Sequence, residues 1–265
     1  MKRLITALIL LPIVVMITVK GGTLFFACLL ALFAAISMLE FYNMALPTRK
    51  GESWLAALTA AALVLAPCST ASSRLLLSIP GLLFLAFSLL FLFRIRAINE
   101  AAHDIAFALL GFLYIPFLLV HLVLLRQTIY GIQWLLVIML IVMTNDSAAY
   151  YSGSAFGTHR LYEKVSPKKS IEGAIGGLFG SVCGTLLAKF TFFPQLTLFD
   201  AVATALVVGM IGQLGDLFES LLKRSFGVKD SGTLIPGHGG VLDRMDSILF
   251  AAPVTYYYVI HVFKG

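Results

Sequence analysis

Charged residues are scarce in this chain of 265 residues. Asp, Glu, Lys and Arg make up 12% of the sequence, against about 25% in soluble domains. Hydrophobic residues make up 60%, and the mean hydropathy is +0.96. This composition excludes a soluble globular protein. It predicts an all-α, polytopic integral membrane protein, because helices satisfy their own backbone polar groups inside lipid.

Cysteine and metal-binding motifs are also rare. Cys28, Cys68 and Cys183 are scattered through apolar sequence without a C-x-x-C pair, so we expect small buried hydrophobic residues rather than disulfides or metal ligands. The absence of an H-E-x-x-H motif and of any Cys/His cluster argues against zinc. No repeat period is visible. Because secondary transporters are commonly built from inverted repeats, this argues against a transporter.

Long apolar runs dominate the remaining sequence. A spanning helix needs roughly 20 mostly apolar residues, and we expect about nine such helices, allowing for uncertain boundaries. Met1, Lys2 and Arg3 precede the first run as in an uncleaved signal anchor. The runs lie at 4–18, 23–45, 54–66, 75–93, 105–125, 132–143, 173–187, 199–222 and 248–263.

Lys and Arg are distributed unequally between the two sides that these spans define. One side receives the N-terminus and the loops near 46–53, 94–103, 144–172 and 223–247, with 14 of the 19 Lys and Arg residues. The positive-inside rule places that side in the cytoplasm. The sequence therefore predicts a protein of the cytoplasmic (inner) membrane, with the N-terminus and the polar loops on the cytoplasmic side.

Acidic residues concentrate in the second half of the chain. We therefore expect an N-terminal transmembrane helical scaffold over 1–130 and a C-terminal transmembrane catalytic region over 131–265, with two cytoplasmic polar loops. Charged groups near hydrocarbon are costly and indicate functional sites. Eight of the 13 acidic residues are Asp146, Glu163, Glu172, Asp216, Glu219, Asp230, Asp243 and Asp246.

Two groups of carboxylates suggest a metal site. Asp216, Ser220 and Lys223 follow a spacing of i, i+4 and i+7, which puts them on one helical stripe. An Asp216–Lys223 ion pair would explain that stripe without any function. Asp243 and Asp246 begin the last predicted helix, where each could simply cap it. Together with Asp216 they offer hard oxygen ligands suited to Mg²⁺.

The loop before that helix, 236–240, reads Pro-Gly-His-Gly-Gly. Glycines allow backbone N–H groups to approach an anion closely. With Lys229 and His238 nearby, we expect a phosphate-binding loop; the alternative is an ordinary interhelical turn.

A second polar segment covers residues 145–173. We expect Asp146 to end a helix, a tight polar turn to follow, and Ser170 and Glu172 to cap the next helix. Lys168 and Lys169 are either positive-inside anchors or ligands of a triphosphate.

These two segments resemble the phosphatidate cytidylyltransferases, also called CDP-diacylglycerol synthases. The resemblance covers about 120 C-terminal residues strongly, and the rest only as apolar helices. In the first segment it rests on Ser220, Lys223, Arg224, Lys229, Asp230, Gly232, Ile235, Pro236, His238, Gly239, Gly240, Val241, Asp243, Arg244, Met245 and Asp246. In the second it rests on Asn145, Asp146, Ala149, Tyr150, Gly153, Phe156, Gly157, Ser166, Pro167, Lys168, Lys169, Ser170, Glu172 and Gly173.

The resemblance implies an Mg²⁺-dependent nucleotidyltransferase that makes CDP-diacylglycerol and pyrophosphate from CTP and phosphatidic acid. It also implies a paired-metal centre that can include K⁺, with Asp216, Asp243 and Asp246 as metal ligands and Lys223 as a further catalytic residue. Whether the chain forms a homodimer is left open, and no nucleic acid partner is expected. The expected substrate-binding residues are Ser220, Arg224, Lys229, His238, Arg244, Lys168, Lys169 and Asp146.

Two other classes stay open: a secondary transporter for an anionic solute, for which inverted repeats would be expected, and a different lipid enzyme. The CDP-alcohol phosphotransferase pattern D-G-x2-A-R-x8-G-x3-D-x3-D is absent. A CTP-dependent enzyme that acts on an isoprenoid lipid stays open, because its headgroup chemistry would look alike.

Overall fold

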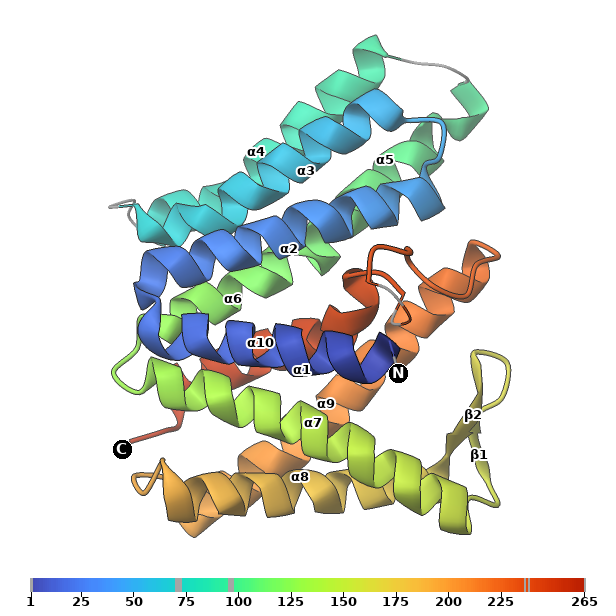
Figure 1. Cartoon of the computed structure of the whole chain (residues 1–265). Coiled ribbons are helices and arrows are strands. Elements are labelled where there is room, and N and C mark those ends of the chain that lie inside the picture. Colours follow the sequence, from blue (N-terminus) through green and yellow to red (C-terminus); the bar gives the residue numbers. More distant parts are fainter. Residues whose placement is uncertain (1, 70–72, 95–97, 236, 238, 265) are drawn as a thin grey trace. The chain divides into compact units, whose positions relative to one another are not determined.

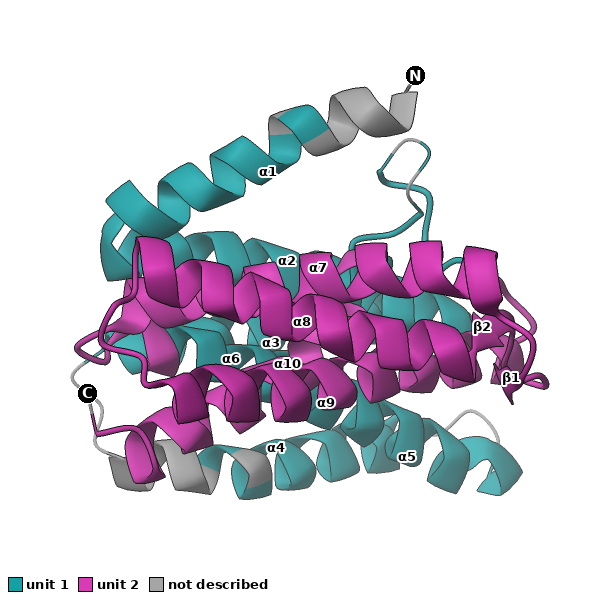
Figure 2. Cartoon of the chain, turned by 90° about the horizontal axis from the view of Figure 1, so that it is seen from below, with its two compact units in different colours: residues 1–123, 230–243 teal, residues 124–229, 244–265 magenta. Residues whose placement is uncertain are grey.

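The computed structural model describes the chain except residues 1, 70–72, 95–97, 236, 238 and 265, and it describes 2–7, 9, 73–78 and 80 by their backbone alone. The described chain forms two compact units (Figure 2). Unit 1 comprises residues 1–123 and 230–243, and unit 2 comprises residues 124–229 and 244–265.

Unit 1 is built from helices of the first half of the chain (Figure 1). Within it, α2 packs against α1, α3 and α5, and α4 packs against α5. Its second segment, 230–243, is the loop that leads into α10. The helices are α1 (Lys2–Lys20), α2 (Gly22–Ala45), α3 (Lys50–Leu65), the short 3-10 helix η1 (Ala66–Cys68), α4 (Ser73–Phe93), α5 (Ile98–Tyr114) and most of α6 (Pro116–Arg126).

Unit 2 contains the longest helices and a small β-hairpin (Figure 1). Here α8 packs between α7 and α9, and the antiparallel strands β1 and β2 precede α8. The elements are α7 (Gly131–Phe156), β1 (Arg160–Tyr162), β2 (Ser166–Ser170), α8 (Ile171–Thr191), α9 (Leu198–Ser225) and α10 (Leu242–His261), whose first residues belong to unit 1.

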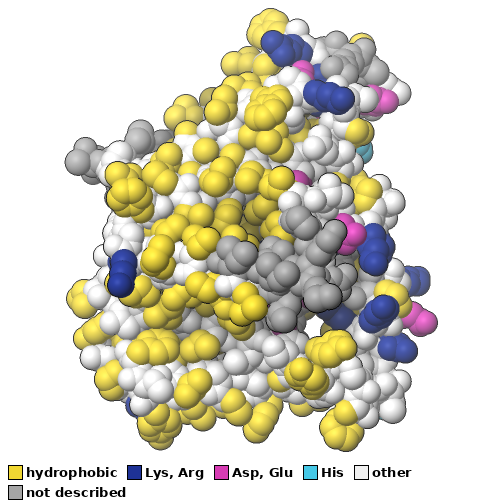
Figure 3. Space-filling view, in the orientation of Figure 1, with side chains coloured by type: hydrophobic (Ala, Val, Ile, Leu, Met, Phe, Trp, Pro, Cys, Tyr) yellow, Lys and Arg dark blue, Asp and Glu magenta, His cyan; other side chains and the backbone are white. Residues whose placement is uncertain are grey.

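The predicted fold class is confirmed. Each of the predicted apolar runs overlaps one helix or, for 54–66 and 105–125, two consecutive helices. Within the described residues, six segments are long and apolar enough to cross a membrane: Gly22–Ala45, Lys50–Cys68, Ile98–Arg126, Gly131–Phe156, Ile171–Thr191 and Leu198–Ser225. Apolar side chains cover much of the visible surface (Figure 3), as expected for helices that face lipid.

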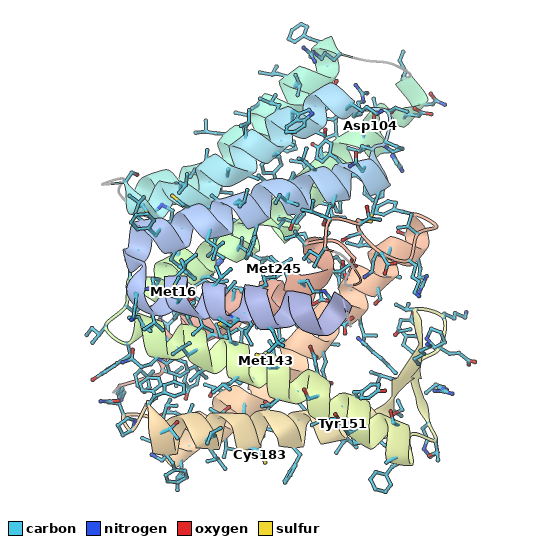
Figure 4. The ribbon with its side chains drawn as sticks, in the orientation of Figure 1. Met16, Asp104, Met143, Tyr151, Cys183 and Met245 are labelled. Carbon is cyan, nitrogen blue, oxygen red and sulfur yellow. The ribbon has the colours of Figure 1, made fainter. Side chains whose placement is uncertain are left out.

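The expected environment of the cysteines is wrong for two of them. Cys28 and Cys183 are exposed, and Cys68 is half-buried; all three are free thiols. Figure 4 shows Cys183 on the outer side of α8. Since a thiol behaves as a small hydrophobic group, it needs no protein cover on an apolar helix surface.

The end of α7 also differs from the prediction. The helix continues to Phe156, so Asp146 lies inside it rather than at its end, and the hairpin β1–β2 replaces part of the expected polar turn. Between Asp146 and Phe156 the sequence contains a single glycine, Gly153. A glycine costs a helix about 1 kcal/mol relative to alanine but does not end it. The predicted Ser170 cap is confirmed: its hydroxyl accepts a hydrogen bond from the Gly173 N–H at 3.1 Å.

Small residues bring α7 and α8 close together. A Cβ atom at Gly180 would lie 2.5 Å from the Cβ of Ala148 and 2.6 Å from the carbonyl oxygen of Thr144. A Cβ at Gly184 would lie 2.6 Å from the Thr144 hydroxyl. Glycine at these positions therefore lets the two backbones approach, as is common between membrane helices.

A buried ion pair joins two parts of unit 1. The guanidinium of Arg49 is 2% exposed and contacts the Asp104 carboxylate at 2.6 and 2.8 Å. It also donates to the Arg94 carbonyl at 2.8 Å and lies 3.6 Å from Glu52. Asp104 is on α5 (Figure 4). The pair therefore ties α5 to the segment between α2 and α3.

Replacing Asp104 with Asn should destabilise the fold, because it leaves a buried guanidinium without its main counter-charge. Breaking such a pair costs about 3–5 kcal/mol, and we expect the lower end because Glu52 stays nearby. Thermal unfolding of the purified protein in detergent measures the loss. The exposed Glu100→Gln change on the same helix is the control; equal melting temperatures for both variants would contradict the assignment.

Candidate functional site

Three helices of unit 2 bring carboxylates together. Asp146 lies on α7, Asp216 on α9 and Asp246 in the first turns of α10. Asp216 interacts electrostatically with both of the others, and Asp146 with Asp246. Like charges repel at such range, so this arrangement calls for cations to neutralise it.

Cations of the protein surround this carboxylate cluster of Asp146, Asp216 and Asp246. The ammonium of Lys169, at the end of β2, lies 2.6 Å from the Asp216 carboxylate, and both side chains are about a third exposed. Arg244 interacts electrostatically with Asp146. The hairpin therefore contributes a positive charge directly to the cluster.

A cavity of about 530 Å³ opens beside these groups within unit 2. It is large enough for much of a nucleotide or a lipid headgroup. Its charged and polar lining includes Asp146, Arg160, Lys168, Lys169, Gln213 and Asp216. Acidic and basic side chains therefore line the same cavity.

Buried amides form one wall of the cavity. The Asn145 side chain donates to the Ser181 hydroxyl at 2.8 Å, and the Gln213 side chain donates to Asn145 Oδ1 at 3.0 Å and to the Ala174 carbonyl at 2.9 Å. These bonds connect α7, α8 and α9. They fix the helices that carry Asp146 and Asp216.

The hairpin is anchored to α8 through Glu172. Its carboxylate accepts hydrogen bonds from the Thr158 hydroxyl at 2.7 Å, from the Thr158 and His159 N–H groups at 3.2 Å, and contacts His159 Nδ1 at 2.7 Å. Glu172 was expected to cap α8. Instead it holds the chain where β1 begins, and so fixes the hairpin that presents Lys168 and Lys169.

The predicted stripe on α9 is helical, but its ion pairs are different from those expected. Lys223 pairs with Glu219 at 2.7 Å, while Asp216 pairs with Lys169. Ser220 is half-buried on the same helix. The simple Asp216–Lys223 pair is therefore replaced by two pairs with other partners.

Two further predicted cations lie outside the cavity lining. Arg224 and Lys229 are exposed near the end of α9 and in the loop that follows, and Arg224 donates to the Val228 carbonyl at 3.4 Å. They flank the entrance to the loop 230–242, which we call the signature loop.

The signature loop belongs to unit 1, where it surrounds two carboxylates. Asp243 Oδ2 accepts hydrogen bonds from the N–H groups of Ser231 at 3.0 Å and Gly240 at 2.7 Å. Glu40, from α2, accepts from the N–H groups of Val241 and Leu242 at 3.0 and 2.9 Å. His238 and Pro236 lie outside the described residues.

These contacts give the signature loop a structural role in addition to the phosphate binding that the sequence predicts for 236–240. The N–H groups of 231, 240, 241 and 242 donate to carboxylates of the protein itself, and an anion would have to displace them. The glycines are explained by this packing: Gly239 has a φ of +83°, and a Cβ there would lie 2.5 Å from Asp243 Oδ2.

The donor set fits a hard divalent cation in its chemistry. Mg²⁺ prefers carboxylate oxygens together with substrate phosphates and water, and the cluster offers carboxylates from three helices. Among the described residues, however, no three Asp, Glu, His or Cys side chains converge closely enough to hold an ion by themselves. Ligands from substrate and water would have to complete the shell.

The sequence analysis missed some residues of the site. Gln213 and Arg160 line the cavity, but neither has a charge pattern that distinguishes it. Glu40 did carry a signal: a lone acidic residue within a long apolar helix is costly unless it has partners.

Comparison with known proteins supports a single family. The cytidylyltransferase family matches residues 1–262 of this chain. The phosphatidate cytidylyltransferase of Staphylococcus epidermidis is 34% identical over 254 residues, which cover 95% of this chain and 96% of that protein. The phosphatidate cytidylyltransferases of Staphylococcus haemolyticus and Staphylococcus aureus are 34% and 33% identical with the same coverage. Since these matches extend over nearly its whole length, this chain belongs to the cytidylyltransferase family.

Proposed function

We propose that this chain is a phosphatidate cytidylyltransferase of phospholipid synthesis. It would transfer CMP from CTP to phosphatidic acid and release CDP-diacylglycerol and pyrophosphate. The observation that carries the proposal is the cavity of unit 2, where Lys169 pairs with Asp216 beside Lys168, Arg160 and Asp146. Family membership and relatives of matching length support the same activity.

Both substrates are polyanions, so repulsion between them opposes the reaction. An oxygen of the phosphatidic acid phosphate attacks the α-phosphorus of CTP, and the bond between the α- and β-phosphates breaks as pyrophosphate leaves. The attacking phosphate is already anionic near neutral pH and needs no residue to deprotonate it. Catalysis then rests on positioning and on neutralising charge.

Lysines and arginines supply the fixed positive charge. Lys168 and Lys169 from the hairpin, with Arg160, would bind phosphate oxygens in the cavity. Lys223, Arg244 and the exposed pair Arg224 and Lys229 would bind further phosphate oxygens, as the signature of the family implies. His238 and Ser220 are assigned to the substrates on the same basis.

We assign Mg²⁺ to the carboxylates of Asp216, Asp243 and Asp246, as the resemblance implies, and K⁺ to a second metal position; Asp146 is assigned to the substrates. Bound Mg²⁺ would polarise the α-phosphate and stabilise the leaving group. The hydrogen bonds to Asp243 Oδ2 suit this role, since carboxylates that bind metals are commonly oriented by other groups. Lys169, which lines the cavity and pairs with Asp216, would bind a phosphate oxygen of the nucleotide.

The membrane setting agrees with this chemistry. The acyl chains of phosphatidic acid keep its headgroup at the interface, because each buried CH₂ contributes about 0.8 kcal/mol. The excess of Lys and Arg in the loops supports a site on the cytoplasmic side of the inner membrane.

The lipid substrate is tested by incubating the purified protein with labelled CTP, Mg²⁺ and either phosphatidic acid or a polyprenyl phosphate. We expect labelled CDP-diacylglycerol with phosphatidic acid and no product with the polyprenyl lipid. The reverse result would make this chain an isoprenoid-dependent enzyme and would overturn the proposal.

Replacing Asp216 with Asn should reduce CMP transfer by at least about 100-fold, because the loss of one preorganised electrostatic group costs about 2.7–4 kcal/mol in a transition state. The rate at saturating CTP and Mg²⁺ measures the effect. Glu163→Gln, an exposed change between the two hairpin strands, is the control. An Asp216→Asn variant as active as this control would remove Asp216 from the site.

Replacing Lys169 with Ala should lower kcat/KM for CTP by about 10- to 100-fold, since hydrogen bonds to charged groups contribute about 1.5–3 kcal/mol. Lys164→Ala changes an exposed lysine of the same hairpin and should leave CTP kinetics unchanged. Initial rates over a range of CTP concentrations test both variants. Identical CTP dependence of the two variants would show that Lys169 does not bind the nucleotide.

A further inference from the structure

Glu40 is a buried carboxylate that the proposed reaction does not yet use. It lies on α2, is 7% exposed, and follows an apolar stretch in which Met38 is fully buried. A charge in such surroundings is costly unless hydrogen bonds satisfy it. The hydrogen-bond partners of Glu40 therefore indicate its role.

Within the described part of the chain, the hydrogen-bond partners of Glu40 all lie in the signature loop. Oε2 accepts from the Ser231 hydroxyl at 3.2 Å and from the Leu242 N–H at 2.9 Å, and Oε1 accepts from the Val241 N–H at 3.0 Å. These residues lie 191 to 202 positions further along the chain. One carboxylate thus binds both ends of the loop.

The contact lies at the start of α10. The first N–H groups of a helix lack partners inside the helix and are commonly capped by a residue just before it. Here the cap comes from another helix, because α10 begins at Leu242 and Glu40 accepts its N–H. A fixed start for α10 fixes the turn that carries Asp243 and Asp246.

Two glycines of the loop fit closely around this carboxylate. A Cβ atom at Gly232 would lie 2.5 Å from Glu40 Oε1, and the three nearest atoms all belong to Glu40. A Cβ at Gly240 would lie 2.5 Å from Oε2. The loop therefore leaves room for the carboxylate and for nothing larger.

We propose that Glu40 is a positioning residue for CMP transfer, which holds the signature loop and the first turn of α10 in the reactive arrangement. The inference rests on the proposed function. Glu40 would act through the loop and α10, without touching substrate. A displacement of about 1 Å at a reacting group can cost about 100-fold in rate, so a carboxylate that sets the start of a helix affects the chemistry carried by that helix.

The first test compares Glu40→Gln, Glu40→Asp and Glu52→Gln in the full chain. Glu52 is a buried carboxylate of the same unit that contacts Arg49 rather than the loop. Hydrogen exchange of peptides covering 230–242, read by mass spectrometry without substrate, should be at least about tenfold faster in Glu40→Gln. It should be unchanged in Glu52→Gln and partly restored in Glu40→Asp, which keeps the charge.

The second readout is kinetic. Glu40→Gln should lower kcat by about 100-fold with less than about a threefold change in KM for CTP, and Glu40→Asp should recover part of kcat. A merely structural role would instead speed exchange across the whole of unit 1 and leave kcat per folded molecule unchanged. That result, or normal loop exchange in Glu40→Gln, would overturn the inference.

A double-mutant cycle isolates the contact itself. Gly232→Ala places a methyl group against Glu40 and should reproduce the loss of kcat. The control is Gly51→Ala, where the added atom meets nothing within 4 Å, and it should leave kcat unchanged. Adding Gly232→Ala to Glu40→Ala should cause little further loss, because the clash is gone. Additive losses would contradict a direct contact.

The outcomes separate this inference from the proposed function. A wild-type protein that transfers CMP, with Glu40→Gln equally active, overturns the positioning role alone. A wild-type protein without CMP transfer overturns the proposed function itself.

Discussion

The high cost of placing charge against hydrocarbon governs this structure. A polytopic helical protein contains few charged residues, because a charge without a partner near lipid costs several kcal/mol. The buried and half-buried charges described above have partners: Arg49 with Asp104, Lys169 with Asp216, and Glu40 with three donors of the loop. Each charge therefore marks a point where the fold or the chemistry needs it.

The same constraint separates stabilising charges from reactive ones. Arg49 and Asp104 are buried together and carry complementary charges. In unit 2 the carboxylates of Asp146, Asp216 and Asp246 lie next to an opening of about 530 Å³, which Lys168 and Lys169 also line. Charges of both signs at an open cavity are suited to binding metal ions and phosphates, whereas a closed ion pair is suited to holding helices together.

Much of this arrangement follows from local sequence. Hydropathy located the spans, because a spanning helix must be apolar over its whole length. Capping chemistry located the start of α8 at Ser170 and placed Asp243 and Asp246 in the opening turns of α10. The resemblance to a known signature directed attention to the segment that Glu40 and Asp243 organise.

The rest depends on contacts that sequence periodicity does not encode. The partner of Glu40 lies about 200 residues away, and nothing in α2 identifies it. Asp216 lies on the same stripe of α9 as Lys223, yet it pairs with Lys169 from the hairpin. The extension of α7 past Asp146 is not evident from the sequence, because the polar residues after Asp146 are typical of a helix end, although Gly153 is the weakest helix former among them.

The anchoring of the hairpin by Glu172 has a consequence for substrate binding. A lysine on a free loop must be ordered when phosphate binds, and ordering the backbone alone costs roughly 1–2 kcal/mol for each residue fixed. Glu172 accepts hydrogen bonds from Thr158 and His159 and therefore orders the hairpin β1–β2 when the protein folds. The hairpin backbone therefore loses its conformational entropy on folding, before the nucleotide binds. The triphosphate then binds to lysines whose backbone is already ordered.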